Sequence, residues 1–104
     1  MACDMVINGV NFPEDEIADF CRRHGVLKLS LFGSILRDDF REDSDVDMLV
    51  EFQPGRTPGM FGFGGMILEL GALVGRTVDL RTPFDLSRHI RPFVLREARL
   101  LHAA

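Results

Sequence analysis

Two aspartates that lie two residues apart are the clearest candidates for chemistry in this sequence. Asp45 and Asp47 stand where an alternating apolar stretch, 46–52, begins. Successive side chains of a strand point to opposite faces, so both carboxylates are expected on one face, close together. Two like charges at such a distance raise the pKa of one carboxyl unless a cation lies between them. Oxygen ligands without a nearby His or Cys select a hard ion, so the pair predicts Mg²⁺ or Mn²⁺.

A third carboxylate, Asp79, lies in a short predicted strand over 78–81. By alternation it could share the face of Asp45 and Asp47, and three acids on neighbouring strands could hold two ions around a phosphoryl group. Each acid also has a simpler interpretation. The charged residues 41–43 make a solvated acidic loop around Asp45 and Asp47 an alternative, and Asp79 alone could be a polar residue of an edge strand.

Gly33 and Ser34 end one predicted strand and begin a short helix. Backbone N–H groups at such a junction bind anions, glycine allows close approach, and serine adds a hydroxyl. An ordinary tight turn with a capping serine is the alternative interpretation. Arg37, one turn later, can reach a phosphate or pair with an acid such as Asp38 or Asp45.

A small set of alternating elements must position these residues. The hydrophobic patterns predict them in this order: helix 13–24, strand 27–32, short helix 34–40, strand 46–52, helix 66–74, strand 78–81, and a last helix that starts at Pro92 and includes Leu101. Strand 27–32 is expected to bury Leu27, Leu29 and Leu31. The glycine-rich residues 56–65 are predicted as a loop, in which Phe61 and Phe63 could contact a partner. The fold class is α/β (α+β), a small mixed sheet flanked by helices.

Length and charge limit the function. The chain has 104 residues, the size of one domain, so residues 1–104 are predicted to form a single domain without a separate substrate domain. A net charge of −4 disfavours direct binding to nucleic acid. The chain lacks the P-loop pattern and the GxSxG elbow, which argues against a P-loop NTPase and against nucleophilic serine catalysis.

The sequence also gives expectations about location and association. The longest uncharged run, 57–68, is too short to span a bilayer, and no secretory signal is visible, so a soluble cytoplasmic protein is expected. Cys3 and Cys21 are expected to be a reduced pair. Exposed apolar surface around Phe61, Phe63 and the last helix predicts association with itself or another chain.

The motifs together resemble the nucleotidyltransferase pattern of the DNA polymerase β superfamily: Leu31-Phe32-Gly33-Ser34, ten intervening residues, Asp45-Val46-Asp47 and a later Val78-Asp79-Leu80. Over nearly the whole chain the sequence more closely resembles the minimal nucleotidyltransferase (MNT) antitoxins of prokaryotic HEPN/MNT toxin–antitoxin pairs. The segments that carry this resemblance are 21–23, 29–32, 44–52, 75–76 and 78–83.

The resemblance implies a polymerase β-like core and a role for each candidate. Gly33 and Ser34, with Arg37, would hold the triphosphate of ATP. Asp45 and Asp47 would bind the Mg²⁺ or Mn²⁺ ions, and Asp79 would complete the metal site and help to activate the acceptor hydroxyl. Family members transfer AMP from ATP to a tyrosine of the HEPN toxin. Asp38 follows Arg37 where relatives often carry glycine, and it adds a negative charge near the phosphate path.

Two other functions compete with protein adenylylation. A binding module could neutralise the toxin by occlusion, without catalysis, although such a module would not need Asp45, Asp47 and Asp79. A small-molecule nucleotidyltransferase subunit could complete its pocket by forming an oligomer, although the short chain argues against this. A screen of small hydroxylated acceptors against a partner protein separates the last function from the first.

Overall fold

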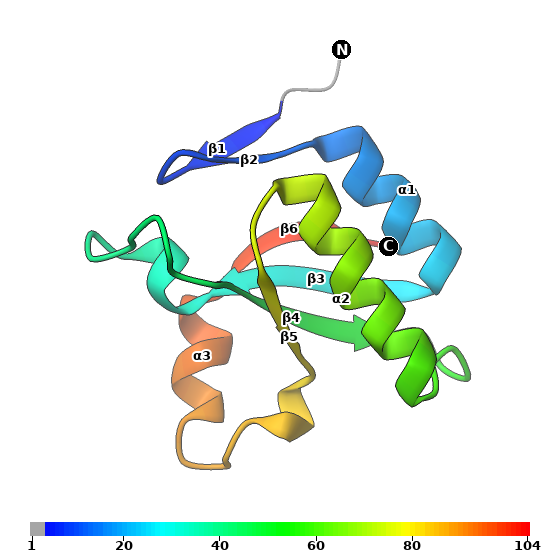
Figure 1. Cartoon of the computed structure of the whole chain (residues 1–104). Coiled ribbons are helices and arrows are strands. Elements are labelled where there is room, and N and C mark those ends of the chain that lie inside the picture. Colours follow the sequence, from blue (N-terminus) through cyan, green and yellow to red (C-terminus); the bar gives the residue numbers. More distant parts are fainter. Residues whose placement is uncertain (1–3) are drawn as a thin grey trace.

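The computed structural model describes residues 4–104, in which a mixed four-stranded sheet separates two helices from a third (Figure 1). The strand order is β5-β4-β3-β6; β4 and β5 are parallel, and the other neighbours are antiparallel. The elements are β1 (Met5–Ile7), β2 (Val10–Phe12), α1 (Glu14–His24), β3 (Val26–Phe32), the 3₁₀ turn η1 (Gly33–Leu36), β4 (Val46–Phe52), α2 (Met60–Val74), β5 (Val78–Arg81), the 3₁₀ turn η2 (Pro83–Asp85), α3 (Arg91–Glu97) and β6 (Arg99–Ala103). This architecture confirms the predicted α+β class.

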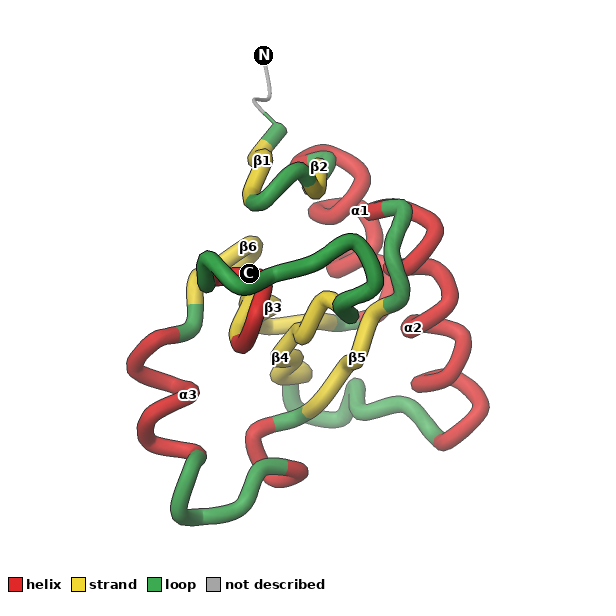
Figure 2. The backbone as a smooth tube through the Cα atoms, turned by 60° about the vertical axis from the view of Figure 1, so that its left-hand side comes forward, coloured by secondary structure: helices red, strands yellow, loops and turns green. Residues whose placement is uncertain are grey.

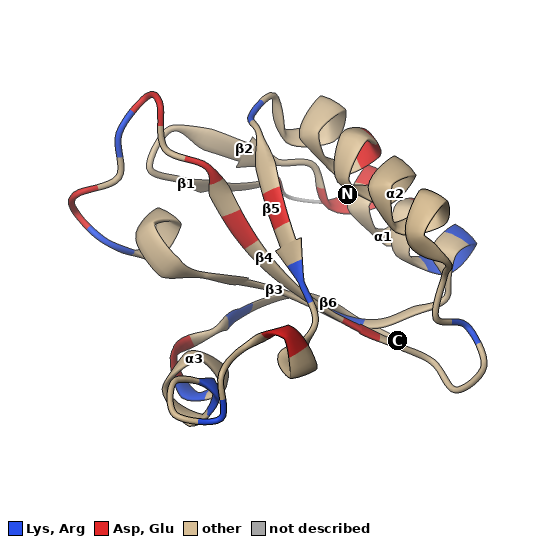
Figure 3. Ribbon diagram, turned by 60° about the horizontal axis from the view of Figure 1, so that its bottom comes forward, with Lys and Arg blue, Asp and Glu red and all other residues tan. Residues whose placement is uncertain are grey.

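One face of the sheet forms the hydrophobic core with α1 and α2. Leu29 and Leu31 of β3 and Met48 and Val50 of β4 are fully buried, together with Phe20 of α1. Their alternation leaves the intervening side chains on the opposite face, which we call the open face. The third helix, α3, lies on this side of the sheet, away from α1 and α2 (Figure 3).

Helix α1 forms where the sequence predicts it. Three acidic residues occupy its first turn, 14–16, and basic residues its last, as the helix dipole favours. Gly25 ends it in the left-handed conformation at φ 68°, and its N–H donates to the Cys21 carbonyl oxygen. Burial raises the pKa of the Cys21 thiol to about 12; Cys3, the other cysteine of the predicted reduced pair, lies outside the described residues.

Strand β3 departs from the simple alternation expected for it. Its pairing with β4 shifts between Val26 and Lys28, so Leu27 is an extra residue in the ladder. Leu27 is 38% exposed, whereas Val26 is buried in its place. The prediction that Leu27 is buried is therefore wrong, because a bulge reverses the side-chain alternation at this point.

Helix α2 begins at Met60, inside the segment predicted as a glycine-rich loop. That prediction is wrong because packing overrides the low helix propensity of glycine. Phe63 packs against the core, with its ring centroid 6.4 Å from that of Phe52. Phe61, by contrast, is 96% exposed.

Both ends of the described chain carry strands that the sequence patterns did not predict. The β1–β2 hairpin precedes α1, and β6 follows α3 and pairs with β3. Figure 2 shows the hairpin beyond the end of the sheet. The last helix ends at Glu97, so the placement of Leu101 in it is wrong. No helix in residues 4–104 is long and apolar enough to span a membrane.

Candidate active site

The parallel pairing of β4 and β5 brings Asp47 and Asp79 side by side. The two residues are register partners, and the apolar neighbours of each, such as Val46 and Val78, are buried in the core. Both carboxylates therefore project from the open face, on backbones roughly 4.8 Å apart. Figure 3 shows acidic segments of β4 and β5 next to each other. The sequence-based expectation that Asp79 shares the face of Asp47 agrees with this geometry.

Asp45 lies immediately before β4, in an exposed loop that Arg76 holds. The Arg76 guanidinium donates hydrogen bonds from Nη2 to the carbonyl oxygens of Ser44 at 2.6 Å and Arg41 at 2.8 Å. It also lies 4.7 Å from the centroid of the Phe40 ring. Three contacts from one side chain fix the loop, so the position of Asp45 depends on Arg76, which comes after helix α2 in the chain.

Burial and neighbouring negative charges both act on the Asp47 carboxyl. The pKa of Asp47 is raised, first by its burial and then by the charge of Asp79, with a further contribution from Asp45. Arg81 and Arg37 act in the opposite direction and do not cancel the rise. A cation placed among the three carboxylates would relieve this repulsion.

The Gly33 turn lies directly against Asp47. Gly33 adopts φ +77°, and a Cβ atom built there would overlap Oδ2 of Asp47 and lie 3.1 Å from its Cγ. Only glycine fits this position without displacing the carboxylate. The turn that the sequence identifies as an anion site and the aspartate that it identifies as a metal ligand are thus adjacent.

The helix predicted to follow this turn is shorter than expected. Residues 33–36 form one 3₁₀ turn, and the chain is extended at Arg37, so the prediction of a helix reaching Phe40 is wrong. A single turn has little macrodipole. Anion binding here would rest on the backbone N–H groups and the half-buried Ser34 hydroxyl.

Asn8 of the β1–β2 hairpin supports this turn from outside the sheet. Its Nδ2 donates to the carbonyl oxygens of Ile35 at 2.7 Å and Arg37 at 2.9 Å. Arg37 itself is exposed and, within residues 4–104, forms no ion pair, so the pairing with Asp38 or Asp45 that the sequence left open is not formed. Arg37, Gly33, Leu36 and Glu97 line a hollow of about 460 Å³.

Asp79 already has a cationic neighbour. Arg81 Nη2 lies 3.3 Å from Asp79 Oδ2, and this pairing raises the pKa of the Arg81 guanidinium. In the part of the chain that the structure describes, no three His, Cys, Asp or Glu side chains are grouped tightly enough to enclose a metal ion as they stand. The Asp79 carboxylate would have to leave Arg81 to join Asp45 and Asp47 around one.

Three residues of this region escaped the sequence analysis. The Asn8-Gly9 pair is a recognisable hairpin-turn signal, and Asn8 does adopt a positive φ of 50°. Arg76 follows the glycine that ends α2, but no spacing rule connects it to the loop before Asp45. Glu97 reaches the hollow only because α3 ends there.

Comparisons with known proteins identify the class first. Residues 14–101 match the family model described as the nucleotidyltransferase domain, so the chain has the fold of a nucleotidyltransferase. A solved structure described as a minimal nucleotidyltransferase aligns with a TM-score of 0.67 and 39% identity, covering 82% of this chain and 85% of that one.

Two curated relatives show which kind of nucleotidyltransferase this chain is similar to. The protein adenylyltransferase MntA of Thermococcus cleftensis is 41% identical over 75 residues, which make up 72% of this chain and 74% of that protein. A protein of Methanocaldococcus jannaschii assigned as a protein adenylyltransferase is 32% identical over 89 residues, 86% of this chain and 94% of its own length. The chain belongs to the nucleotidyltransferase family and, within it, to the MntA-type protein adenylyltransferases.

Toxin–antitoxin complexes contain the same fold at lower sequence identity. One such complex with AMP-PNP aligns with a TM-score of 0.68 at 20% identity, covering 88% of this chain and 73% of that one. Another, of an MNT antitoxin with the tri-AMPylated HEPN toxin of Shewanella oneidensis, aligns with a TM-score of 0.61 at 19% identity, covering 88% and 70%.

Proposed function

We propose that this protein transfers AMP from ATP to a hydroxyl group of a HEPN-type toxin, with tyrosine as the expected acceptor, and so acts as its antitoxin. The observation that supports the proposal is the contact between the Gly33 turn and Asp47, because a turn suited to binding phosphate then lies beside a carboxylate suited to binding a metal ion. The family membership supports the adenylyl transfer. The MNT antitoxin complexed with a tri-AMPylated HEPN toxin supports the choice of acceptor.

The chain's own residues would bind and orient the nucleotide. The N–H groups of the turn and the Ser34 hydroxyl donate to the triphosphate, and the unpaired Arg37 contributes a positive charge at the same hollow. Such groups hold the α-phosphate in line with the attacking oxygen, and positioning of this kind supplies much of the catalysis in phosphoryl transfer.

A divalent cation fits the remaining chemistry. Asp45, Asp47 and Asp79 offer only oxygen donors, and the pKa of Asp47 is raised by its burial and then by the negative charges of Asp79 and Asp45. Mg²⁺ or Mn²⁺ held by these carboxylates would supply charge neutralisation at the phosphates.

The reaction balances without a further reactant. The acceptor oxygen forms a bond to the α-phosphorus, the bond between that phosphorus and the bridging oxygen breaks, and pyrophosphate leaves. The acceptor hydroxyl loses its proton, and we assign Asp79 to accept it, because Asp79 lies beside Asp47 on the open face.

Transfer of label from ATP tests the proposal. The purified protein is incubated with Mg²⁺ and the HEPN protein encoded next to it, using ATP labelled at the α- or the γ-phosphate. We expect α-label on the HEPN protein, no γ-label, and loss of transfer with EDTA. Tight binding and toxin inhibition without α-label would instead establish neutralisation by occlusion, and γ-label would establish a kinase.

A further inference from the structure

Helix α3 differs from the other two helices in having no buried residue. Phe93 is 59% exposed and Leu95 47%, and Leu100 just beyond the helix is 48% exposed. A surface helix normally buries its apolar side chains against the core of its own protein. A helix that leaves aromatic and aliphatic side chains exposed therefore has apolar surface to bury against another molecule.

The same segment is strongly basic in an acidic protein. Residues 88–99 contain four arginines and a single carboxylate, Glu97, although the chain has a net charge of −4. Arg91 is engaged with the backbone, since its Nε donates to the Pro83 carbonyl oxygen at 2.7 Å. The other three, Arg88, Arg96 and Arg99, are exposed and form no ion pair within residues 4–104.

This surface is continuous with the candidate active site. Glu97 lines the hollow that contains Gly33 and Arg37, at the phosphate-binding turn. Leu95 and Leu100 line a smaller hollow with Leu49, which lies on the open face two residues after Asp47 in β4. A molecule bound along α3 would therefore lie next to the Gly33 turn.

We propose that the exposed side chains of Arg88, Phe93, Leu95, Arg96 and Leu100, here called the α3 surface, dock the acceptor protein through a face that is apolar at its centre and acidic at its rim. The inference rests on the proposed function, because it names where that acceptor binds. Arg96 lies 5.6 Å from the centroid of the Phe93 ring, so charge and apolar area form one patch.

A protein face fits this surface better than nucleic acid does. Phosphate backbones require a basic groove, whereas the α3 surface contains three large apolar side chains, Phe93, Leu95 and Leu100. Protein interfaces combine an apolar core with charged residues at the rim, and arginine is enriched in them. Charges at the rim mainly accelerate association and fix the orientation.

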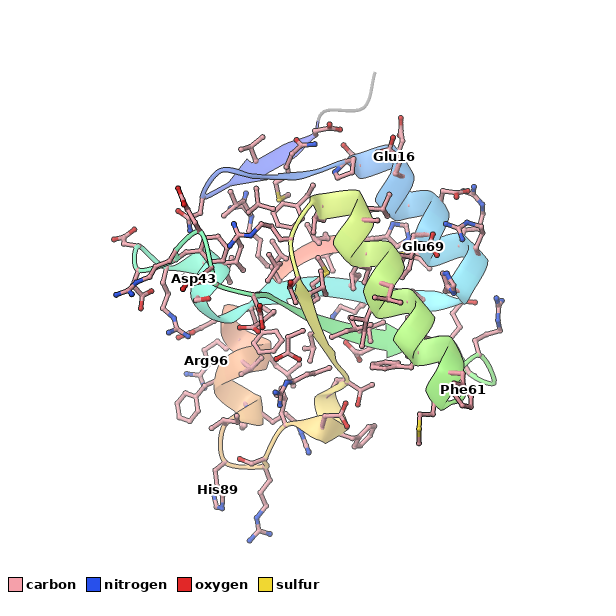
Figure 4. All side chains as sticks on the ribbon, in the orientation of Figure 1. Glu16, Asp43, Phe61, Glu69, His89 and Arg96 are labelled. Atoms are coloured by element: carbon pink, nitrogen blue, oxygen red, sulfur yellow. The ribbon has the colours of Figure 1, made fainter. Side chains whose placement is uncertain are left out.

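Matched variants on opposite sides of the sheet test the docking surface. Arg88→Glu combined with Arg96→Glu reverses the charge, and Phe93→Ser removes the largest apolar side chain. The controls are Arg22→Glu on α1 and Phe61→Ser on α2, whose side chains are 73% and 96% exposed. Figure 4 shows Arg96 and Phe61 in separate regions of the molecule.

Acceptor binding and label transfer are measured separately for each variant. We expect the α3 variants to weaken acceptor binding and raise the KM for the acceptor by about tenfold or more, while the KM for ATP stays within about twofold. The two controls should change neither constant by more than about twofold. The affinity of the wild type should fall with added salt, and the charge-reversed variant should lose most of that dependence.

The outcomes separate this proposal from the proposed function. If the wild type binds the acceptor but transfers no label, the proposed function fails, and the binding data still decide the docking surface. Unchanged acceptor binding in folded Arg88→Glu/Arg96→Glu and Phe93→Ser proteins would overturn the α3 surface. A second result would also overturn the α3 surface as an acceptor site. If the wild type binds a fluorescent single-stranded RNA and the α3 variants lose that binding but keep acceptor binding, the surface binds nucleic acid instead.

Discussion

Two groups of carboxylates on opposite sides of the sheet have opposite electrostatic surroundings. Between α1 and α2, Asp19 and Glu69 are matched by cations: Arg23 pairs with both, with Nε 2.8 Å from an Asp19 oxygen, and His24 Nε2 lies 3.0 Å from Glu69 Oε1. A hydrogen bond from Arg23 is the main cause that lowers the pKa of each carboxyl. Figure 4 shows Glu69 on α2, on the side of α1.

On the open face the acids outnumber their cationic partners. Asp79 pairs with Arg81, but the pKa of Asp47 rises through burial and the neighbouring negative charges. The sheet holds these carboxylates together against their repulsion, since Asp47 and Asp79 are fixed by strand register. The comparison shows that the acids between α1 and α2 are matched by cations, whereas the open-face acids outnumber their cationic partners, as expected for a candidate ligand site.

The largest difference in AMP transfer is expected between the variants Asp47→Asn and Glu69→Gln. Asp47→Asn should reduce AMP transfer at least about a hundredfold, because a group that binds the developing charge is lost. Its thermal midpoint should stay level or rise, since the repulsion with Asp79 is relieved. Label transfer and thermal unfolding measure the two effects.

Glu69→Gln is the matched control and should behave in the reverse way. It should leave transfer within about twofold of the wild type and slightly lower the midpoint, because exposed ion pairs contribute little each. Retained transfer in Asp47→Asn would contradict the assignment of the open-face acids. Lost transfer in Glu69→Gln would remove the distinction between the two groups.

A pair of glycines gives the next largest effect. Gly33 and Gly55 both have φ +77°, but a Cβ at Gly55 meets nothing within 4 Å, whereas one at Gly33 overlaps Asp47. Gly55→Ala should cost about 1 kcal/mol of unfolding free energy, from the left-handed backbone alone. Gly33→Ala should cost about 1–3 kcal/mol more and reduce transfer. Denaturant unfolding measures both losses. Equal losses of unfolding free energy in Gly33→Ala and Gly55→Ala would show that a Cβ atom at position 33 does not clash with Asp47.

The dependence of stability on pH should have opposite signs at the two groups. The pKa of Glu69 is lowered from 4.5, so its stabilising contribution is present above that pH and is lost as the pH falls through the folded value. The pKa of Asp47 is raised from 3.8, so folding binds a proton there, and this carboxylate destabilises the protein as the pH rises above 3.8.

Denaturant unfolding between acid and neutral pH checks these signs. At neutral pH, Asp47→Asn should be more stable than the wild type and Glu69→Gln less stable. The difference for Asp47→Asn should shrink as the pH falls toward 3.8, and the difference for Glu69→Gln should shrink as the pH falls below 4.5. Differences of the same sign in the two variants would contradict the contrast.

The sequence predicts the central part of the fold because its patterns are local. The charged turns and Gly25 define α1, and apolar alternation defines β4 and β5. The β1–β2 strands have three residues each, too few for alternation to be read, and β6 exists through its pairing with β3. The start of α2 depends on packing of Phe63 that no local rule reveals.

The same limit applies to the site. Spacing predicts Asp45, Asp47 and the Gly33-Ser34 turn, since each lies at the end of a recognisable element. The register of Asp79 with Asp47, the Arg76 contacts to the loop and the Arg81 ion pair depend on tertiary placement. Residue type and position in the chain do not determine which neighbour a side chain meets.

Crystals grown with Mn²⁺ and a non-hydrolysable ATP analogue test the central claim most directly, because anomalous scattering locates the ion without assumptions. The account predicts an anomalous peak between the carboxylates of Asp45 and Asp47, within reach of Asp79, with the triphosphate on the Gly33 turn. Bound nucleotide without Mn²⁺ at these carboxylates, or Mn²⁺ at Asp19 and Glu69 instead, would contradict it.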